Sequence, residues 1–264
     1  MGADAGQAGP GRRGFRVDRV SEHLHFVHTP HVNWSIYAGP DGVTLIDAGY
    51  VGQRDLLVAS LQIIGCRVED VSAVLLTHGH ADHLGGAAWL AATFGTRVYA
   101  HPLEVRNVRR DVVEQAGVAD LVRQAWRPGV LRWALDILPL LDRNPALGVP
   151  DVAAIPMRDG EADVPGHPRV ILVEGHTTGH TAFDFEGEGV LVVGDCLATR
   201  HGTSHLAGPQ LLPSVFHHDL AGARETLGQL RGSSSRVVVP GHGEAWIGSV
   251  DAMVDAALRA GTAW

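Results

Sequence analysis

Both halves of this chain alternate short apolar strands with helices, and in both halves strands end at loops that carry His and Asp side chains. Apolar runs bounded by turn residues predict strands at 24–28, 34–38, 43–47, 71–77, 97–100, 170–173, 182–185, 190–193 and 236–239. Apolar residues three or four apart predict helices at 52–64, 85–94, 118–126, 219–230 and from Val250 to Leu258. Because hairpin-like strand pairs dominate both halves, this pattern favours two sheets packed face to face, with helices outside, over a doubly wound sheet.

The chain is long enough for one domain with a sizeable core. It has 264 residues, of which 45% are hydrophobic and 19% charged, as in a folded globular domain. We predict a single domain over residues 19–264, preceded by a disordered tail over residues 1–18. The first fourteen residues lack the apolar core of a secretory signal, and no apolar run approaches the roughly 18 residues of a membrane span. These features predict a cytoplasmic protein with no membrane partner.

The charge of the chain argues against a nucleic-acid partner. The net charge is −8, and all 21 basic residues are arginines that form only short pairs. An acidic surface repels polyanions, so a small-molecule substrate is the partner we expect. The two cysteines, Cys66 and Cys196, are too few for a disulfide framework and suit a reducing compartment.

Four residues that can bind a metal follow the apolar segment 71–77 within six positions: His78, His80, Asp82 and His83. Neutral imidazole and carboxylate are the groups that zinc and similar divalent ions accept. His78 and His80 are two residues apart, so an extended backbone projects both side chains the same way. Asp82 and His83 come after the bend and can face a second point nearby. A single histidine on a loop would be interpreted as an exposed surface residue without a function, whereas this spacing indicates a metal site.

The motif resembles the signature of the metallo-β-lactamase-fold hydrolases, and three later motifs occur in the order of that family. They are Gly-His-Thr at 175–177, Gly-Asp at 194–195 and Pro-Gly-His-Gly at 240–243. The resemblance spans roughly residues 20–250. It implies an α+β protein, built as a four-layer αββα sandwich of the metallo-β-lactamase type with a helical lid insertion.

The resemblance also implies a dinuclear metal centre. One metal would be held by His78, His80 and His176, the other by Asp82, His83 and His242, with Asp195 between them. The expected cofactors are two Zn²⁺ ions, although iron or manganese also accepts nitrogen and oxygen ligands. Two cations lower the pKa of bound water towards neutrality. We therefore expect attack by metal-bound hydroxide, with Asp82 as the catalytic residue that orients it and shuttles a proton to the leaving group.

Other residues near these motifs are interpreted individually. Asp47 lies at a strand end where the family keeps an aspartate behind the ligands, and it would either fix a ligand's tautomer or cap a turn. We interpret His180 as supporting a ligand or the fold rather than as a ligand. His217 either lines the pocket or caps a helix. Cys196 is expected to be an inert buried thiol. The remaining histidines, interpreted as structural or surface residues, include His23, His25, His28, His31, His101, His167, His201 and His205.

Residues 103–147 form the predicted helical insertion between the first and second ligand motifs. The stretch from Val130 to Leu141 is apolar on most faces, so it is either buried itself or covers another part of the protein. As a lid, it would wall an apolar substrate pocket with Leu131, Trp133, Leu135, Leu138 and Leu141. The alternative is that this face packs on the core or forms a homodimer contact.

The substrate class is narrowed by departures from other members of the family. Diiron flavoprotein reductases carry glutamate where this chain has His80. Glyoxalase-II-like thioesterases have a helical domain after the last ligand, whereas only 22 residues follow His242 in this chain. Nuclease members insert a large second domain. These comparisons favour a hydrolase of lactones, esters or thioesters with a small apolar substrate. The alternatives are a mononuclear iron persulfide-dioxygenase-like enzyme, a β-lactam-hydrolysing member and a non-catalytic binding protein.

Overall fold

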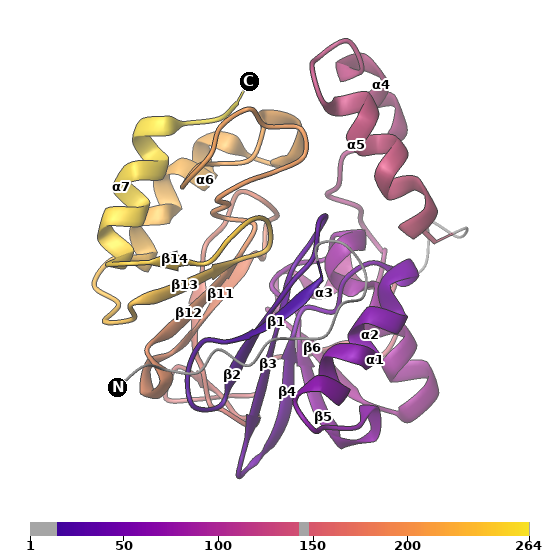
Figure 1. Ribbon diagram of the computed structural model, residues 1–264, viewed down its shortest axis with the longest axis vertical. Helices are drawn as coiled ribbons and strands as arrows, with labels where there is room; N and C mark the ends of the chain where they lie inside the picture. The colour runs from indigo at the N-terminus through magenta and orange to yellow at the C-terminus, as the bar shows by residue number, and fades with distance from the viewer. Residues whose placement is uncertain (1–14, 143–147, 264) are drawn as a thin grey trace.

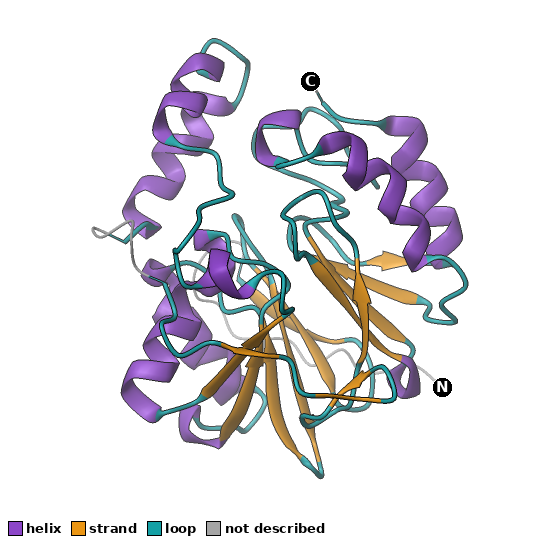
Figure 2. Ribbon diagram, turned by 180° about the vertical axis from the view of Figure 1, so that it is seen from behind, coloured by secondary structure: helices purple, strands orange, loops and turns teal. Residues whose placement is uncertain are grey.

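The computed structural model describes residues 15–142 and 148–263, which form two facing sheets with helices on both outer faces (Figures 1 and 2). The first sheet has seven strands in sequential order: β1 (Arg16–Arg19), β2 (Leu24–His28), β3 (Trp34–Gly39), β4 (Gly42–Ile46), β5 (Val71–Leu75), β6 (Arg97–Ala100) and β7 (Ala153–Ala154). The second has seven strands in the order β14 (Trp246–Ile247), β13 (Val237–Pro240), β12 (Val190–Gly194), β11 (Thr181–Phe185), β10 (Arg169–Leu172), β9 (Glu161–Ala162) and β8 (Met157–Arg158).

Parallel strand pairing brings the loops that carry Asp47 and the predicted ligands to one edge of the sandwich. β4 pairs in parallel with β5 in the first sheet, and β12 pairs in parallel with β13 in the second. The carboxyl ends of parallel strands lie at the same edge of a sheet. All four of these strands lead into the loops that carry the predicted ligands or Asp47.

The helices cover the outer faces of the sheets. The α-helices are α1 (Arg54–Ile63), α2 (Ala81–Phe94), α3 (Val105–Val108), α4 (Val118–Gln124), α5 (Val130–Ile137), α6 (Leu220–Thr226) and α7 (Val250–Ala260). The short 3₁₀ helices are η1 (Val51–Gln53), η2 (Val68–Asp70), η3 (Leu138–Leu140), η4 (Glu186–Glu188), η5 (Ser214–Phe216) and η6 (Leu227–Leu230). Figure 1 shows α1 and α2 beside the first sheet, α6 and α7 beside the second, and α4 and α5 standing away from both. Within the described part of the chain, no helix is long and apolar enough to cross a membrane.

Three apolar clusters confirm the four-layer sandwich. Phe26, Phe183 and Phe185 belong to the cluster between the two sheets. A second cluster joins the first sheet to α1 and α2, and a third, which includes Met253, joins the second sheet to α7. Each face of each sheet is therefore covered, as the αββα prediction requires.

The predicted disordered tail over residues 1–18 is wrong at its end. Residues 1–14 lie outside the described residues, but Arg16–Arg19 form β1 and pair antiparallel with β2. The Arg16 side chain forms ion pairs with Asp18 and Glu244. The segment has no apolar run, so its strand conformation comes from hydrogen bonds to β2 rather than from a local pattern.

Helix α2 begins at Ala81, four residues before the predicted start at 85. His80 is the residue before the helix and is extended, and the Gln115 side chain accepts a hydrogen bond from Ala81 N–H. Asp82 and His83 therefore lie in the first helical turn rather than in a loop. A carboxylate is favourable at that position because it faces the positive end of the helix dipole.

Two glycines let α2 lie close to the loop after β4. A Cβ atom on Gly85 would come within 2.2 Å of Val51 N, and one on Gly86 within 2.4 Å of Ala48 O. Only glycine permits such an approach between backbones. This packing brings His83, on the first turn of α2, against Asp47.

Candidate metal centre

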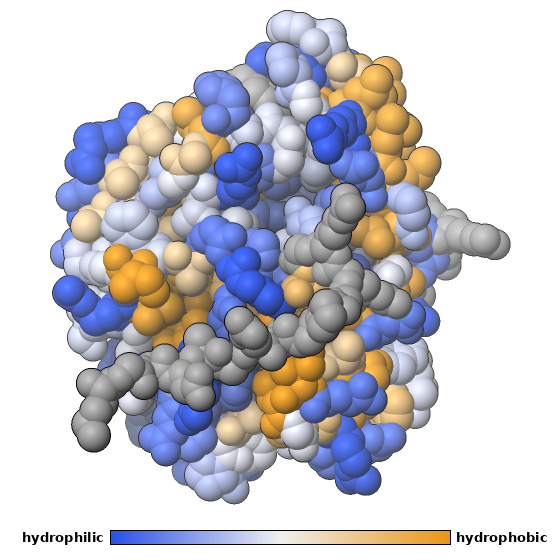
Figure 3. Space-filling view, in the orientation of Figure 1, coloured by the Kyte–Doolittle hydropathy of each residue, from blue (hydrophilic) through white to orange (hydrophobic). Residues whose placement is uncertain are grey.

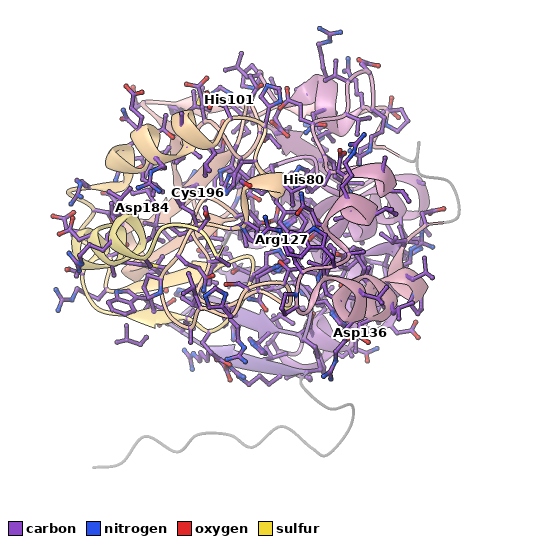
Figure 4. All side chains as sticks on the ribbon, turned by 90° about the horizontal axis from the view of Figure 1, so that it is seen from above. His80, His101, Arg127, Asp136, Asp184 and Cys196 are labelled. Atoms are coloured by element: carbon purple, nitrogen blue, oxygen red, sulfur yellow. The ribbon has the colours of Figure 1, made fainter. Side chains whose placement is uncertain are left out.

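Seven predicted side chains from four separate segments meet between the two halves of the molecule. His80, labelled in Figure 4, lies in the interior there. The first group is His78, His80, His176 and Asp195, and the second is Asp82, His83, Asp195 and His242. In each group the ligand atoms all lie within 4.8 Å of one another.

Asp195 belongs to both groups. Its Oδ2 atom lies 3.5 Å from His176 Nε2 and 3.2 Å from His242 Nε2. Its Oδ1 atom lies 3.3 Å from His83 Nε2. A carboxylate that faces both groups is suited to lie between two cations, as in other two-metal sites.

Buried atoms without partners show that the residues fit a cation. Among the described residues, His78 Nε2, His83 Nε2 and Asp195 Oδ1 are sealed from water and have no hydrogen-bond partner. Burying such atoms costs free energy unless a partner satisfies them. Imidazole nitrogen and carboxylate oxygen are ligand atoms for zinc and related divalent ions. The donor set is therefore suited to a divalent metal.

The charges at the centre favour a cation as well. Burial lowers the pKa of His78 and that of His176 well below the ordinary value, so both rings are neutral and offer a lone pair. Burial also acts to lower the pKa of His242, but the carboxylates of Asp195 and Asp82 outweigh it and raise that pKa to about 10. Burial acts to raise the pKa of Asp82, but His83 and His242 lower it to about 2. A bound cation would replace the histidine protons, because ligation requires neutral imidazole.

Asp47 fixes the orientation of two ligands. Its Oδ2 atom accepts hydrogen bonds from His83 Nδ1–H (2.8 Å) and from the Thr77 hydroxyl (2.8 Å). The Thr77 oxygen in turn accepts from His78 Nδ1–H at 2.9 Å. These bonds place the ring protons on Nδ1 and leave Nε2 of His78 and His83 free for a metal. The backbone of Asp47 is left-handed (φ 63°), a conformation that aspartate tolerates better than most residues.

Backbone carbonyls orient two further ligands. His80 Nε2–H donates to Glu114 O at 2.7 Å, which leaves Nδ1 free beside His176 Nε2 at 3.1 Å. His242 Nδ1–H donates to His31 O at 2.6 Å, which leaves Nε2 facing the carboxylates. Four of the five ligand histidines thus have their metal-facing nitrogen set by a bond at the other nitrogen.

Glu104 is a buried carboxylate that belongs to none of the predicted motifs. It is 1% exposed and accepts hydrogen bonds from Gly79 N–H and Gly179 N–H, both at 2.8 Å. It also accepts from the Thr177 hydroxyl at 2.9 Å. The carboxylate therefore ties the first ligand loop to the second. No local pattern marks Glu104, because its partners are distant in sequence.

His180 and His217 lie outside both groups. His180 Nε2 accepts a hydrogen bond from Asp195 N–H at 3.1 Å, so this nitrogen positions Asp195 and does not face the ligand atoms. His217 Nε2–H donates to Leu212 O at 3.1 Å, and its ring lies 5.2 Å from that of His176. Cys196 is buried, and burial raises the pKa of its thiol.

A cavity of about 330 Å³ adjoins the two groups. Five of the seven predicted ligands line it: His80, Asp82, His176, Asp195 and His242. Most of the remaining wall is apolar or aromatic and comes from both halves and from the insertion: Tyr50, Val51, Leu84, Val113, Val118, Leu121, Trp133, Ile137, Leu141, Leu212 and Phe216. Polar and charged residues also line the cavity, among them Arg110, Gln115, Asp142 and His201. The cavity can therefore hold an apolar group against the candidate metal centre.

The prediction that five residues of the stretch Val130–Leu141 wall the pocket is only partly correct. Trp133 and Leu141 line the cavity, but Leu131, Leu135 and Leu138 are 58%, 60% and 63% exposed. The helical repeat places Val130, Trp133 and Ile137 on the inner face of α5 and the three leucines on the outer face. Ile137, which the prediction omitted, lines the cavity in their place.

The chain is similar to known metallo-hydrolases. A model of the metallo-beta-lactamase superfamily matches residues 29–242. The probable metallo-hydrolase YflN of Bacillus subtilis is 26% identical over 248 residues, which cover 90% of this chain and 85% of YflN. The probable metallo-hydrolase YybB of the same organism is 26% identical over 186 residues, which cover 68% of this chain and 66% of YybB. A metallo-beta-lactamase family protein from Thermus thermophilus aligns with a TM-score of 0.59 at 27% identity, over 85% of this chain and 72% of that structure.

The chain belongs to the metallo-beta-lactamase superfamily. The matched region contains all seven predicted ligands, from His78 to His242. Fold, ligand-type residues and relatives agree that the protein is a metallo-hydrolase, which confirms the family and the enzyme class expected from the sequence.

Proposed function

We propose that the protein is a cytoplasmic dinuclear zinc hydrolase that cleaves an ester-like bond, in a lactone, ester or thioester, of a small apolar substrate. The observation that carries this proposal is the pair of ligand groups sharing Asp195 at the wall of a largely apolar cavity. The two free thiols, Cys66 and Cys196, fit a reducing compartment.

Each group would hold one cation, with Asp195 between the two. When bound, the metal pair supplies a water of lowered pKa and polarises the carbonyl of the substrate. Asp82 lines the cavity, and its Oδ2 atom lies 3.4 Å from His242 Nε2. In this position Asp82 can orient the attacking water, accept its proton and pass that proton to the leaving group.

The cavity would bind the apolar part of the substrate. Its volume of about 330 Å³ is at the lower end of the range for small-molecule sites, roughly 300–1,000 Å³. Trp133, Ile137 and Phe216 offer apolar surface but no charge to an acyl chain or ring. The substrate we expect is therefore modest in size, with its scissile carbonyl towards Asp82 and its hydrocarbon towards α5.

Elemental analysis combined with a substrate panel tests the proposal. We expect about two divalent ions per chain and turnover of lactones, thioesters or aryl esters. The His78→Ala variant, which lacks one ligand, should lose metal and activity together. One iron per chain with oxygen consumption would instead support the persulfide-dioxygenase-like alternative. Turnover of β-lactams alone would support the β-lactamase alternative, and a metal-loaded protein inert towards the panel would contradict the proposal.

A further inference from the structure

His201 lies where the insertion meets the candidate metal centre. It is 6% exposed and lines the cavity together with Asp82, Asp195 and His242. Its ring centroid is 4.8 Å from that of His242, 5.3 Å from that of Trp133 and 5.1 Å from that of Phe216. From the sequence, His201 is interpreted as a structural or surface histidine. The structure instead places it beside the predicted ligands.

The hydrogen bonds of His201 determine which of its nitrogens carries the proton. The Thr203 backbone N–H donates to His201 Nδ1 at 3.3 Å, and the Thr203 hydroxyl lies 2.8 Å from the same nitrogen. A backbone N–H can only donate, so Nδ1 acts as an acceptor and is unprotonated. The imidazole is therefore neutral, with its proton on Nε2. Within the described ranges, Nε2 makes no hydrogen bond, so this N–H is available to a molecule in the cavity.

Close packing holds the ring in this orientation. A Cβ atom on Gly202 would lie 2.6 Å from Trp133 Cδ1, and one on Gly129 would lie 2.9 Å from Gly202 O. The start of α5 and the backbone after His201 therefore fit together without space for a side chain. Since Trp133 contacts both Gly202 and the His201 ring, the insertion positions the histidine as well as walling the cavity.

We propose that His201 is a further catalytic residue of this site, whose Nε2–H donates a hydrogen bond to the carbonyl oxygen of the bound ester-like substrate. The inference rests on the hydrolase function proposed above. A neutral imidazole N–H is a hydrogen-bond donor rather than a proton source at neutral pH, so the proton stays on Nε2 throughout. Negative charge grows on the carbonyl oxygen as water attacks, and a fixed donor stabilises that charge more than it stabilises the bound substrate.

Substitution of His201 by Phe tests the catalytic role. His201→Phe keeps an aromatic ring between Trp133 and Phe216 but removes the donor. Loss of one such donor lowers kcat by about 10²–10³-fold in comparable sites, with KM nearly unchanged. His201→Gln, which carries an N–H₂ donor, should recover part of the loss. His205→Phe, at an exposed position of the same loop, is the matched control and should keep wild-type activity.

Two further measurements separate catalysis from a structural role. Nitrogen-15 NMR of the zinc-loaded wild type should show His201 protonated at Nε2 and not at Nδ1. The metal content of His201→Phe should equal that of the wild type, and its affinity for a phosphonate analogue of the transition state should fall by about the same factor as kcat.

The outcomes distinguish this inference from the proposed function. If the wild type hydrolyses the panel and His201→Phe is equally active, or if the proton is found on Nδ1, the role of His201 is wrong and the hydrolase proposal stands. If His201→Phe loses metal in step with activity, the residue is structural and the inference is overturned. If the wild type hydrolyses no ester-like bond, both proposals fail together.

Discussion

A single carboxylate, Asp47, sets the tautomers of two candidate ligands in this protein. It accepts from His83 directly and reaches His78 through the Thr77 hydroxyl. Those bonds keep a proton on Nδ1 of both rings, so the Nε2 atoms are the ones that a metal can bind. Glu104 has a comparable role for the backbone, since it accepts N–H groups from both Gly79 and Gly179.

The Asp47→Asn variant tests this control of tautomers. Asparagine tolerates the left-handed backbone of residue 47. With its Oδ1 atom held by Thr77 N–H, as Asp47 Oδ1 is, its amide N–H₂ faces His83 and cannot accept the hydrogen bond from Nδ1–H. The His83 ring would then carry its proton on Nε2 and bind metal poorly. We expect metal affinity to fall by about 10–100-fold, as for other residues that support a ligand, measured by chelator competition. Asp251→Asn, on the surface-exposed start of α7, is the control, and equal affinities in the two variants would contradict the prediction.

Helix α5 has two apolar faces with different surroundings. The inner face, with Trp133 and Ile137, lines the cavity and is almost fully buried. The outer face carries Leu131 and Leu135 and continues to Leu138, the first residue of η3, and all three are more than half exposed. Polar residues on this helix also point to solvent, and Figure 4 shows Asp136 at the edge of the molecule. The cavity-lining face and the exposed apolar face therefore lie on opposite sides of one helix.

Neighbouring residues Ile137 and Leu138 provide a matched test of the two faces. Ile137→Ala removes apolar wall, and each lost methylene contact is worth about 0.8 kcal/mol. We expect KM to rise by about tenfold or more for esters with long acyl chains and little for acetate esters. Leu138→Ala should leave KM unchanged for both kinds of ester. If Ile137→Ala raised KM equally for esters with long and short acyl chains, the prediction that this cavity binds the acyl group would be wrong.

The outer face of the insertion is suited to association with a second copy of the chain, and we propose a homodimer there. Exposed apolar residues of the insertion that do not line the cavity include Val122 on α4, Trp126 just after it, Leu131 and Leu135 on α5, and Leu138 at the start of η3. In Figure 3, orange atoms gather on the end of the molecule formed by α4 and α5. Contiguous apolar patches on soluble proteins commonly mark contact sites.

Light scattering after gel filtration tests the homodimer and should give twice the chain mass. The double variant Leu131→Glu/Leu135→Glu should give a monomer. A monomeric wild type at micromolar concentration would contradict this.

At the scale of the whole molecule, the candidate metal centre joins the two halves of the sandwich. His78, His80, Asp82 and His83 follow β5 of the first sheet, whereas His176, Asp195 and His242 come from loops of the second. A cation bound by both sets would connect halves that otherwise meet through the inter-sheet core and side-chain contacts. Stability should therefore depend on metal.

Metal removal tests this dependence. A ligand present at 1,000 times its dissociation constant stabilises the folded state by about 4 kcal/mol. For a chain of this length that corresponds to a fall in Tm of about 10 °C on chelation, measured by scanning calorimetry with zinc and with excess chelator. The His242→Ala variant should show a much smaller difference between the two conditions. Identical Tm values for the wild type would show that no cation links the halves.

Local patterns were sufficient for much of this architecture. The strands at 24–28 and 97–100 match the structure because their apolar runs are bounded by turn residues within a few positions. The four ligand motifs were recognisable for the same reason, since each follows a strand directly. Strand β1 had no such signal, because Arg16–Arg19 is polar and is extended only through pairing with β2.

The residue types at the candidate centre, and the strands that carry them, are therefore properties of short stretches of sequence. Four features depended on the fold: which nitrogen of each ligand ring carries the proton, the role of Glu104, which residues form the inner face of α5, and the position of His201. Each of these follows from a contact between residues far apart in the chain, such as Glu104 with Gly179 or His201 with His242. Spacing along one segment carries no information about which distant atom will accept or donate a hydrogen bond, because that is settled only when the two sheets pack together.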